Sequence, residues 1–123
     1  MATAKGNEII EAARAHFASR LNSNELDFVE VPEWGTPDSP ARIYYKPMNL
    51  EQQNKIYQYV AQNSLESIAQ TIITRARDED GRRMFADAHK LYFMKEVDPA
   101  VMTRIVTEMA GDEDIDEGEA VKN

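Results

Sequence analysis

The segment from Phe28 to Pro47, FVEVPEWGTPDSPARIYYKP, constrains the fold more than any other part of the chain. Two runs rich in β-branched and aromatic residues, 28–31 and 41–46, flank a stretch of Gly, Thr, Pro, Asp and Ser that is typical of a turn. The segment is therefore predicted to form a β-hairpin. A two-stranded hairpin is at best marginally stable alone in water, so it has to pack against other elements.

The two faces of this hairpin differ in polarity, because side chains alternate across a strand. One face is predicted to carry Val29, Val31, Ile43 and Tyr45, and the other face Glu30, Arg42, Tyr44 and Lys46. The apolar face needs a cover, and the flanking helical patterns or another chain have to supply it.

Helical periodicity is present on both sides of the hairpin. The predicted helices cover 7–20, 49–62, 64–76, about 86–94 and 98–110. Their predicted N-caps are Asn7, Asn49 with Gln52 as a capping box, Ser64, and Asp98 followed by Pro99.

The helical segments differ in how much apolar surface they offer for packing. The 64–76 segment has the widest apolar stripe and is predicted to be the central core helix. In the 49–62 segment the predicted buried side carries Leu50, Ile56, Tyr57 and Val60. In the 86–94 segment Ala88, Leu91 and Tyr92 share a stripe, although Tyr92-Phe93-Met94 also fits a short strand.

These elements predict an α+β fold in which the hairpin packs with four or five α-helices. One domain is expected at residues 1–110. Residues 111–123, GDEDIDEGEAVKN, contain six carboxylates and two large apolar residues, so they cannot offset their ordering entropy by burial. A disordered acidic tail is predicted there.

Composition excludes several classes of function. The net charge is −8, from 22 acidic and 14 basic residues, and the closest basic groups are separated by Asp78-Glu79-Asp80, so no nucleic-acid partner is expected. The absence of cysteine excludes disulfides and thiolate chemistry. No apolar run approaches the roughly 18 residues of a membrane span, and the first residues lack a secretory signal. We expect a soluble cytoplasmic protein with no membrane partner.

No residue pattern indicates catalysis, a cofactor or a metal. His16 and His89 have no partner at metal-ligand spacing. The alternating acids 112, 114 and 116 start like a calcium loop, but Glu117 stands where that loop needs glycine. Glu30 and Glu33 are best interpreted as surface charges. An enzyme is not expected.

Aromatic residues are the remaining candidates for binding, because Tyr and Trp are frequent at binding hot spots. Tyr45 and Tyr57 are expected to face the core, whereas Trp34, Tyr44 and Tyr59 are candidate partner-binding residues. Trp34 is either a lid on the core or an exposed anchor, and the lid is preferred because a small hairpin needs the burial.

Four segments together resemble one known family: VEVPEWG (29–35), ARIYYKPMNLEQQNKI (41–56), IITRARDEDGRRMF (72–85) and DPAVMTRI (98–105). In this order they resemble the tail assembly chaperones of long-tailed bacteriophages. In that family a valine-rich strand ending in Pro-x-Trp-Gly leads to a second strand, a helix pair, an Asp-Glu-Asp-Gly turn and an Asp/Ser-Pro helix. The resemblance covers about residues 28–108. The chain departs from the family in its longer N-terminal helix and in an insertion at 36–40.

The resemblance implies a non-enzymatic protein of the host cell cytoplasm that is absent from the mature virion. It would bind the tape measure protein, keep it soluble and help recruit tail tube subunits. Many relatives are also made as a longer frameshifted form. We further expect a homo-oligomer, because the hairpin has free edges and a long partner needs many copies to coat it. The alternative is an acidic inhibitor or nucleic-acid mimic, suggested by the charge of −8 and the DEDIDE stretch.

Overall fold

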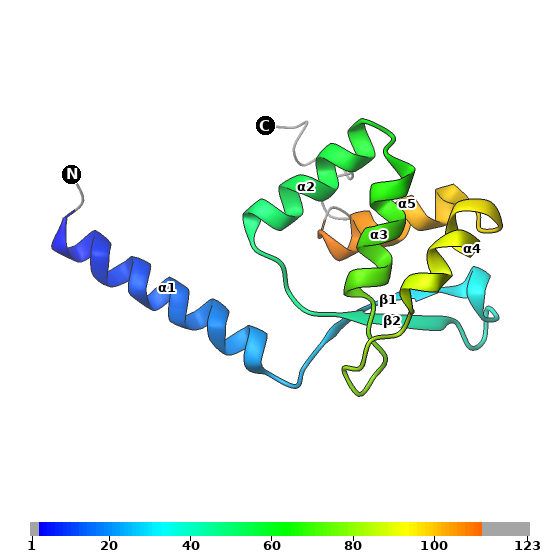
Figure 1. Ribbon diagram of the computed structural model, residues 1–123. Coiled ribbons are helices and arrows are strands. Elements are labelled where there is room, and N and C mark those ends of the chain that lie inside the picture. Colours follow the sequence, from blue (N-terminus) through cyan, green and yellow to red (C-terminus); the bar gives the residue numbers. More distant parts are fainter. Residues whose placement is uncertain (1–2, 112–123) are drawn as a thin grey trace.

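The computed structural model describes residues 3–111 as an α+β fold in which a two-stranded antiparallel sheet packs with α-helices (Figure 1). This confirms the predicted fold class. The elements in chain order are α1 (Ala4–Asn22), β1 (Asp27–Val31), the 3-10 turn η1 (Pro32–Trp34), β2 (Ala41–Tyr45), α2 (Leu50–Ala61), α3 (Leu65–Arg75), the 3-10 turn η2 (Asp87–His89), α4 (Lys90–Lys95) and α5 (Pro99–Met109). The predicted acidic tail lies almost wholly outside the described residues, and the domain boundary at 110 stays a prediction.

The hairpin forms with the predicted alternation of faces. β1 and β2 pair antiparallel, with Val29 opposite Ile43 and Val31 opposite Ala41. Val29, Val31 and Ile43 are fully buried, whereas Phe28 is exposed on the outer face. The turn chemistry and the alternation together therefore set the register, because a slip by one residue would turn the valines to solvent.

The core lies between the sheet and the helices, with α3 at its centre. α5 contacts both β1 and α3, while α2 and α4 pack on other sides of α3. Four residues of α3 are buried: Ile68, Ala69, Ile72 and Ile73. This confirms the predicted central helix. On α5, Val101, Ile105 and Met109 are buried as well.

Several helix ends follow the predicted chemistry. Asn49 Oδ1 accepts a hydrogen bond from the Gln52 backbone N–H at 2.8 Å, and the Gln52 side chain accepts from the Asn49 N–H at 3.0 Å, which completes a capping box. Asp98 caps α5 through the Ala100 N–H at 3.0 Å. Gly81 adopts a φ of 84°, the left-handed conformation that its turn requires.

Two predicted caps were wrong in detail. α1 begins three residues before Asn7, because the hydroxyl of Thr3 accepts from the Gly6 N–H at 3.0 Å and starts the helix there. Ser64 occupies the N-cap position of α3, but its hydroxyl donates to the Ser67 hydroxyl at 2.9 Å instead of capping the backbone. Both helices form, so the error concerns the ends alone.

The segment before α5 is helical, as predicted, but it presents a different face to the core. The predicted stripe of Ala88, Leu91 and Tyr92 is exposed, and Phe93 is the buried residue of α4. The Phe93 ring lies 5.0 Å from the Phe85 ring, edge to face. Because α4 has six residues, the burial of this one aromatic side chain decides which face of the helix meets the core.

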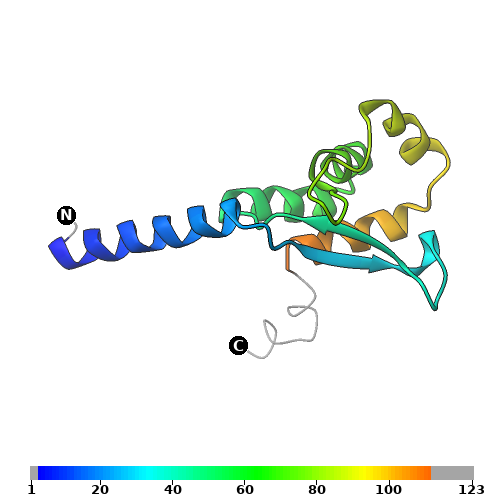
Figure 2. The same cartoon turned by 90° about the horizontal axis from the view of Figure 1, so that it is seen from below.

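α1 projects away from the rest of the molecule (Figures 1 and 2). It is helical as predicted, yet none of its residues is buried. At its C-terminal end the Lys46 ammonium donates to the Leu21 carbonyl at 3.2 Å, and Arg20 lies 3.5 Å from the carboxylate of Asp27. Within residues 3–111, no other element covers the apolar side of α1.

Candidate binding surfaces

The three candidate binding aromatics lie on three different elements. Trp34 is in η1, Tyr44 in β2 and Tyr59 in α2. Within residues 3–111 no ring contact joins any two of them. Among the described residues, the three rings therefore do not form one aromatic cluster.

Trp34 covers one end of the core. It is half-buried, packs against the core cluster, and its ring lies 6.0 Å from the Phe93 ring. Gly35 allows the close turn that follows, since a Cβ there would lie 2.6 Å from the Ser39 carbonyl oxygen. This is the geometry of the lid rather than of a free anchor.

The residue next to Trp34 ties the hairpin to α5. Glu33 receives two hydrogen bonds from the Arg104 guanidinium, at 2.7 and 2.9 Å. This bidentate contact lowers the pKa of Glu33 to about 2 and raises the pKa of Arg104. Both side chains are more than a third exposed, so the pair fixes geometry more than it adds stability.

Tyr44 lies on the outer face of the hairpin in a contact made within the chain. Its ring is 5.4 Å from the Phe28 ring, and the Arg42 guanidinium lies 4.5 Å from the centre of that same ring. The Tyr44 backbone also exchanges two hydrogen bonds with Arg77, at 2.7 and 2.9 Å. The outer edge of β2 is consequently paired at this point, and the expectation of free hairpin edges was wrong there.

Tyr59 lies at the edge of the core. It is half-buried and packs against the core cluster. It lines a shallow cavity of about 270 Å³ with Thr71 and Arg75 of α3. Tyr59 therefore lies at the contact between α2 and α3.

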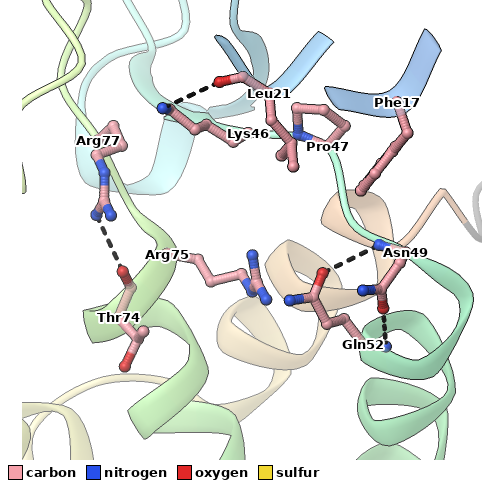
Figure 3. Close-up of a pocket in the computed structure, with 9 residues that line it drawn as sticks. All are labelled: Phe17, Leu21, Lys46, Pro47, Asn49, Gln52, Thr74, Arg75 and Arg77. Atoms are coloured by element: carbon pink, nitrogen blue, oxygen red, sulfur yellow. Dashed lines mark hydrogen bonds between the residues drawn. The ribbon is translucent and has the colours of Figure 1, made fainter. Parts of the chain in front are cut away.

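A small basic cavity lies where the end of α1 meets β2, α2 and α3 (Figure 3). It has a volume of about 240 Å³ and is lined by Phe17, Leu21, Lys46, Pro47, Asn49, Gln52, Thr74, Arg75 and Arg77. Lys46 and Arg77 donate to backbone carbonyls, of Leu21 at 3.2 Å and of Thr74 at 2.9 Å. These bonds hold the base of α1 and the chain after α3 in place.

Arg75 is the one cation of this cavity that has no hydrogen bond or ion pair within residues 3–111. Its side chain extends into the space between α3 and Gln52 (Figure 3). Burial and the neighbouring Arg77 charge lower the pKa of Arg75. Chemically, the three cationic side chains of the cavity suit an anion.

A larger apolar groove separates α1 from the first turn of α2. Its volume is about 1050 Å³, and it is lined by Glu11, Ala13, Arg14, Ala15, Phe17, Ala18, Leu21, Asn49, Leu50 and Glu51. Leu50 is 82% exposed, so its predicted burial was wrong. Leu50 is the first residue of α2, directly after the Asn49 cap, and its side chain lies outside the core.

A second apolar surface lies on α4. Leu91, Tyr92 and Met94 are 58, 56 and 45% exposed. We call these three residues the α4 patch. The sequence signal for it was present, since Leu91 and Tyr92 share a predicted helical stripe.

Within residues 3–111, no group of three or more His, Cys, Asp and Glu side chains could hold a metal ion. Nor does any helix of the described residues have the length and apolar character needed to cross a membrane. Comparisons of the chain with protein-family models, with curated proteins and with solved structures gave no match. The site assignments below therefore rest on this chain's own residues.

Proposed function

We propose that this protein is a tail assembly chaperone of a long-tailed bacteriophage. In this role it binds the tape measure protein, keeps it soluble and helps recruit tail tube subunits. The proposal starts from the resemblance of residues 28–108, and one structural observation supports it: within residues 3–111, large apolar side chains remain exposed on three helices, α1, α2 and α4, although the core is closed. Uncovered apolar patches are typical of surfaces that bind other proteins.

The α4 patch is the surface we assign to the tape measure protein. A long helical partner presents a repeating apolar stripe, and short apolar patches can bind such a stripe at several places along its length. Lys90 and Lys95 stand at the two ends of α4, and Lys90 already pairs with Glu66 at 2.9 Å. A partner stripe flanked by carboxylates would complement these lysines.

The charge of the chain fits a soluble coat. With a net charge of −8, copies that cover a partner repel further association and keep the complex in solution. Catalysis is not part of the proposal.

Co-expression with the long helical protein encoded beside this one tests the proposal. We expect the tape measure protein to move into the soluble fraction when this chain is present. Leu91→Ser should reduce that effect, while Phe28→Ser, which removes an exposed aromatic from the hairpin's outer face, should not. Circular dichroism on both variants checks that they fold.

Two outcomes would contradict the proposal. One is a tape measure protein whose solubility is the same with and without this chain. The other is capture of a basic partner whose binding falls steeply as salt rises, because that behaviour characterises an acidic inhibitor or nucleic-acid mimic.

A further inference from the structure

α1 is a long helix whose apolar side has no partner within the described chain. Its 19 residues make it about 28 Å long, and none of them is buried. Ile9 and Ile10 are each 58% exposed near its free end. Phe17 and Leu21, near its base, are half-buried and line the apolar groove beside α2. A helix without tertiary packing gains little stability from propensity alone, so a cover is expected.

The two halves of α1 carry opposite charge. Glu8 and Glu11 lie in the N-terminal half with Lys5, whereas Arg14 and Arg20 lie in the C-terminal half. Glu11 and Arg14 both line the groove, and they are 3.0 Å apart on the helix surface. The N-terminal half of the helix is therefore net acidic and the C-terminal half net basic. Each half also carries apolar side chains, so the two halves can pair.

This pattern matters because it distinguishes possible occupants of the groove. A parallel pair of α1 helices would place Glu11 beside Glu11 and Arg14 beside Arg14, so like charges would meet. An antiparallel pair related by a two-fold axis places each Glu11 opposite the other copy's Arg14, and every favourable contact occurs twice. A helix of a different protein would not require α1 to complement itself.

We propose that the groove between α1 and α2 is filled by α1 of a second copy of this chain, in an antiparallel two-fold dimer. The Ile10 side chain of one copy then lies against Phe17 and Leu21 of the other, because these three residues share one side of the helix. The alanines at 15 and 18, which share a face with Glu11 and Arg14, let the two backbones approach closely. The surface differs from the α4 patch, so a dimer can still present two such patches to a partner.

The size of the contact sets the expected strength. A pair of helices of this length with a few large apolar residues each buries less than the standard interface of roughly 1,600 Å². We expect a dimer that dissociates in the micromolar range, about 1 to 100 μM.

Sedimentation equilibrium of the full chain tests the dimer and its geometry. Glu11→Arg should weaken dimerisation about tenfold, because it places two arginines together at each of two symmetric contacts. The double variant Glu11→Arg with Arg14→Glu should restore it to within about threefold of the original value, since opposite charges again face each other. Asp38→Arg, an equal charge change in the exposed hairpin loop, is the matched control and should leave dimerisation unchanged.

Folding does not confound this experiment, because α1 contributes no buried residue and circular dichroism can confirm the helix in each variant. A chain that sediments as a monomer up to roughly 500 μM would overturn the proposal. So would a dimer that Glu11→Arg leaves intact, or one that the double variant fails to restore. The measurement uses the isolated protein, so its result is independent of whether the tape measure protein is the partner.

Discussion

Replacing Trp34 by alanine removes the lid over one end of the core. Truncating a fully buried aromatic side chain to alanine costs about 3–5 kcal/mol of folding stability. Trp34 is half-buried and keeps one ring neighbour, Phe93, at 6.0 Å, so the expected cost is about 2–3 kcal/mol. This is a large share of a total stability that for such domains is about 5–15 kcal/mol.

Thermal and urea unfolding followed by circular dichroism measure this cost. For a domain of this size, about 2–3 kcal/mol corresponds to a fall in Tm of roughly 10–20 °C. Tyr44→Ala is a suitable comparison, because Tyr44 lies on the outer face of the hairpin against Phe28, and we expect it to cost less.

Fluorescence gives an independent check, because Trp34 is the only tryptophan of the chain. A lid predicts blue-shifted emission and weak quenching by acrylamide in the folded protein. The reasoning would be refuted by emission at the wavelength of free tryptophan together with a Trp34→Ala variant that melts at the original temperature.

Three further changes test the fold. Ile72→Ala, in the centre of α3, should cost about 2–5 kcal/mol in urea unfolding, because the fully buried site cannot collapse around the lost atoms. Asn49→Ala removes one half of the capping box and should lower stability by about 1 kcal/mol. Asn49→Asp keeps a side-chain oxygen that can accept the same hydrogen bond, so it should cost much less. The Glu33–Arg104 contact lowers the folded-state pKa of Glu33 from 4.5 to about 2, so its contribution to stability is complete above pH 4.5 and is lost as the pH falls toward 2. In Glu33→Gln that part of the acid dependence should disappear, and an unchanged acid profile would show that the contact is not formed in solution.

Local sequence rules were sufficient for the hairpin and for several helix ends. The alternation of Val29 and Val31 with polar neighbours determines which face is buried, and that pattern is visible without knowing the partner. The capping box of Asn49 and Gln52 is also local, because both hydrogen bonds lie within one turn. Such features depend on neighbours in sequence, which is why they could be predicted.

The errors concern features that tertiary packing decides. Leu50 fits the apolar stripe of α2, but the first turn of α2 faces the open groove, so the side chain stays exposed. In α4 the ring of Phe93 packs against the rings of Phe85 and Trp34. Because Phe93 faces the core, Leu91 lies on the exposed side of this short helix. Periodicity indicates which residues share a face and leaves open which face meets the core.

The binding surfaces could be predicted only in part. The three aromatics chosen from the sequence are large and amphipathic, but Trp34, Tyr44 and Tyr59 all have ring or core contacts within the chain. The uncovered surfaces consist mainly of aliphatic residues such as Ile9 and Leu91, which composition alone assigns to a core. Only the arrangement of the helices distinguishes them.

The most direct test of the proposed function is the mass of a complex between this protein and the tape measure protein, purified together and measured by light scattering after size exclusion. The proposal predicts a soluble complex with several copies of this chain on each tape measure protein, and fewer copies for Leu91→Ser. A tape measure protein that elutes without this chain, or that precipitates in its presence as it does alone, would contradict the chaperone function.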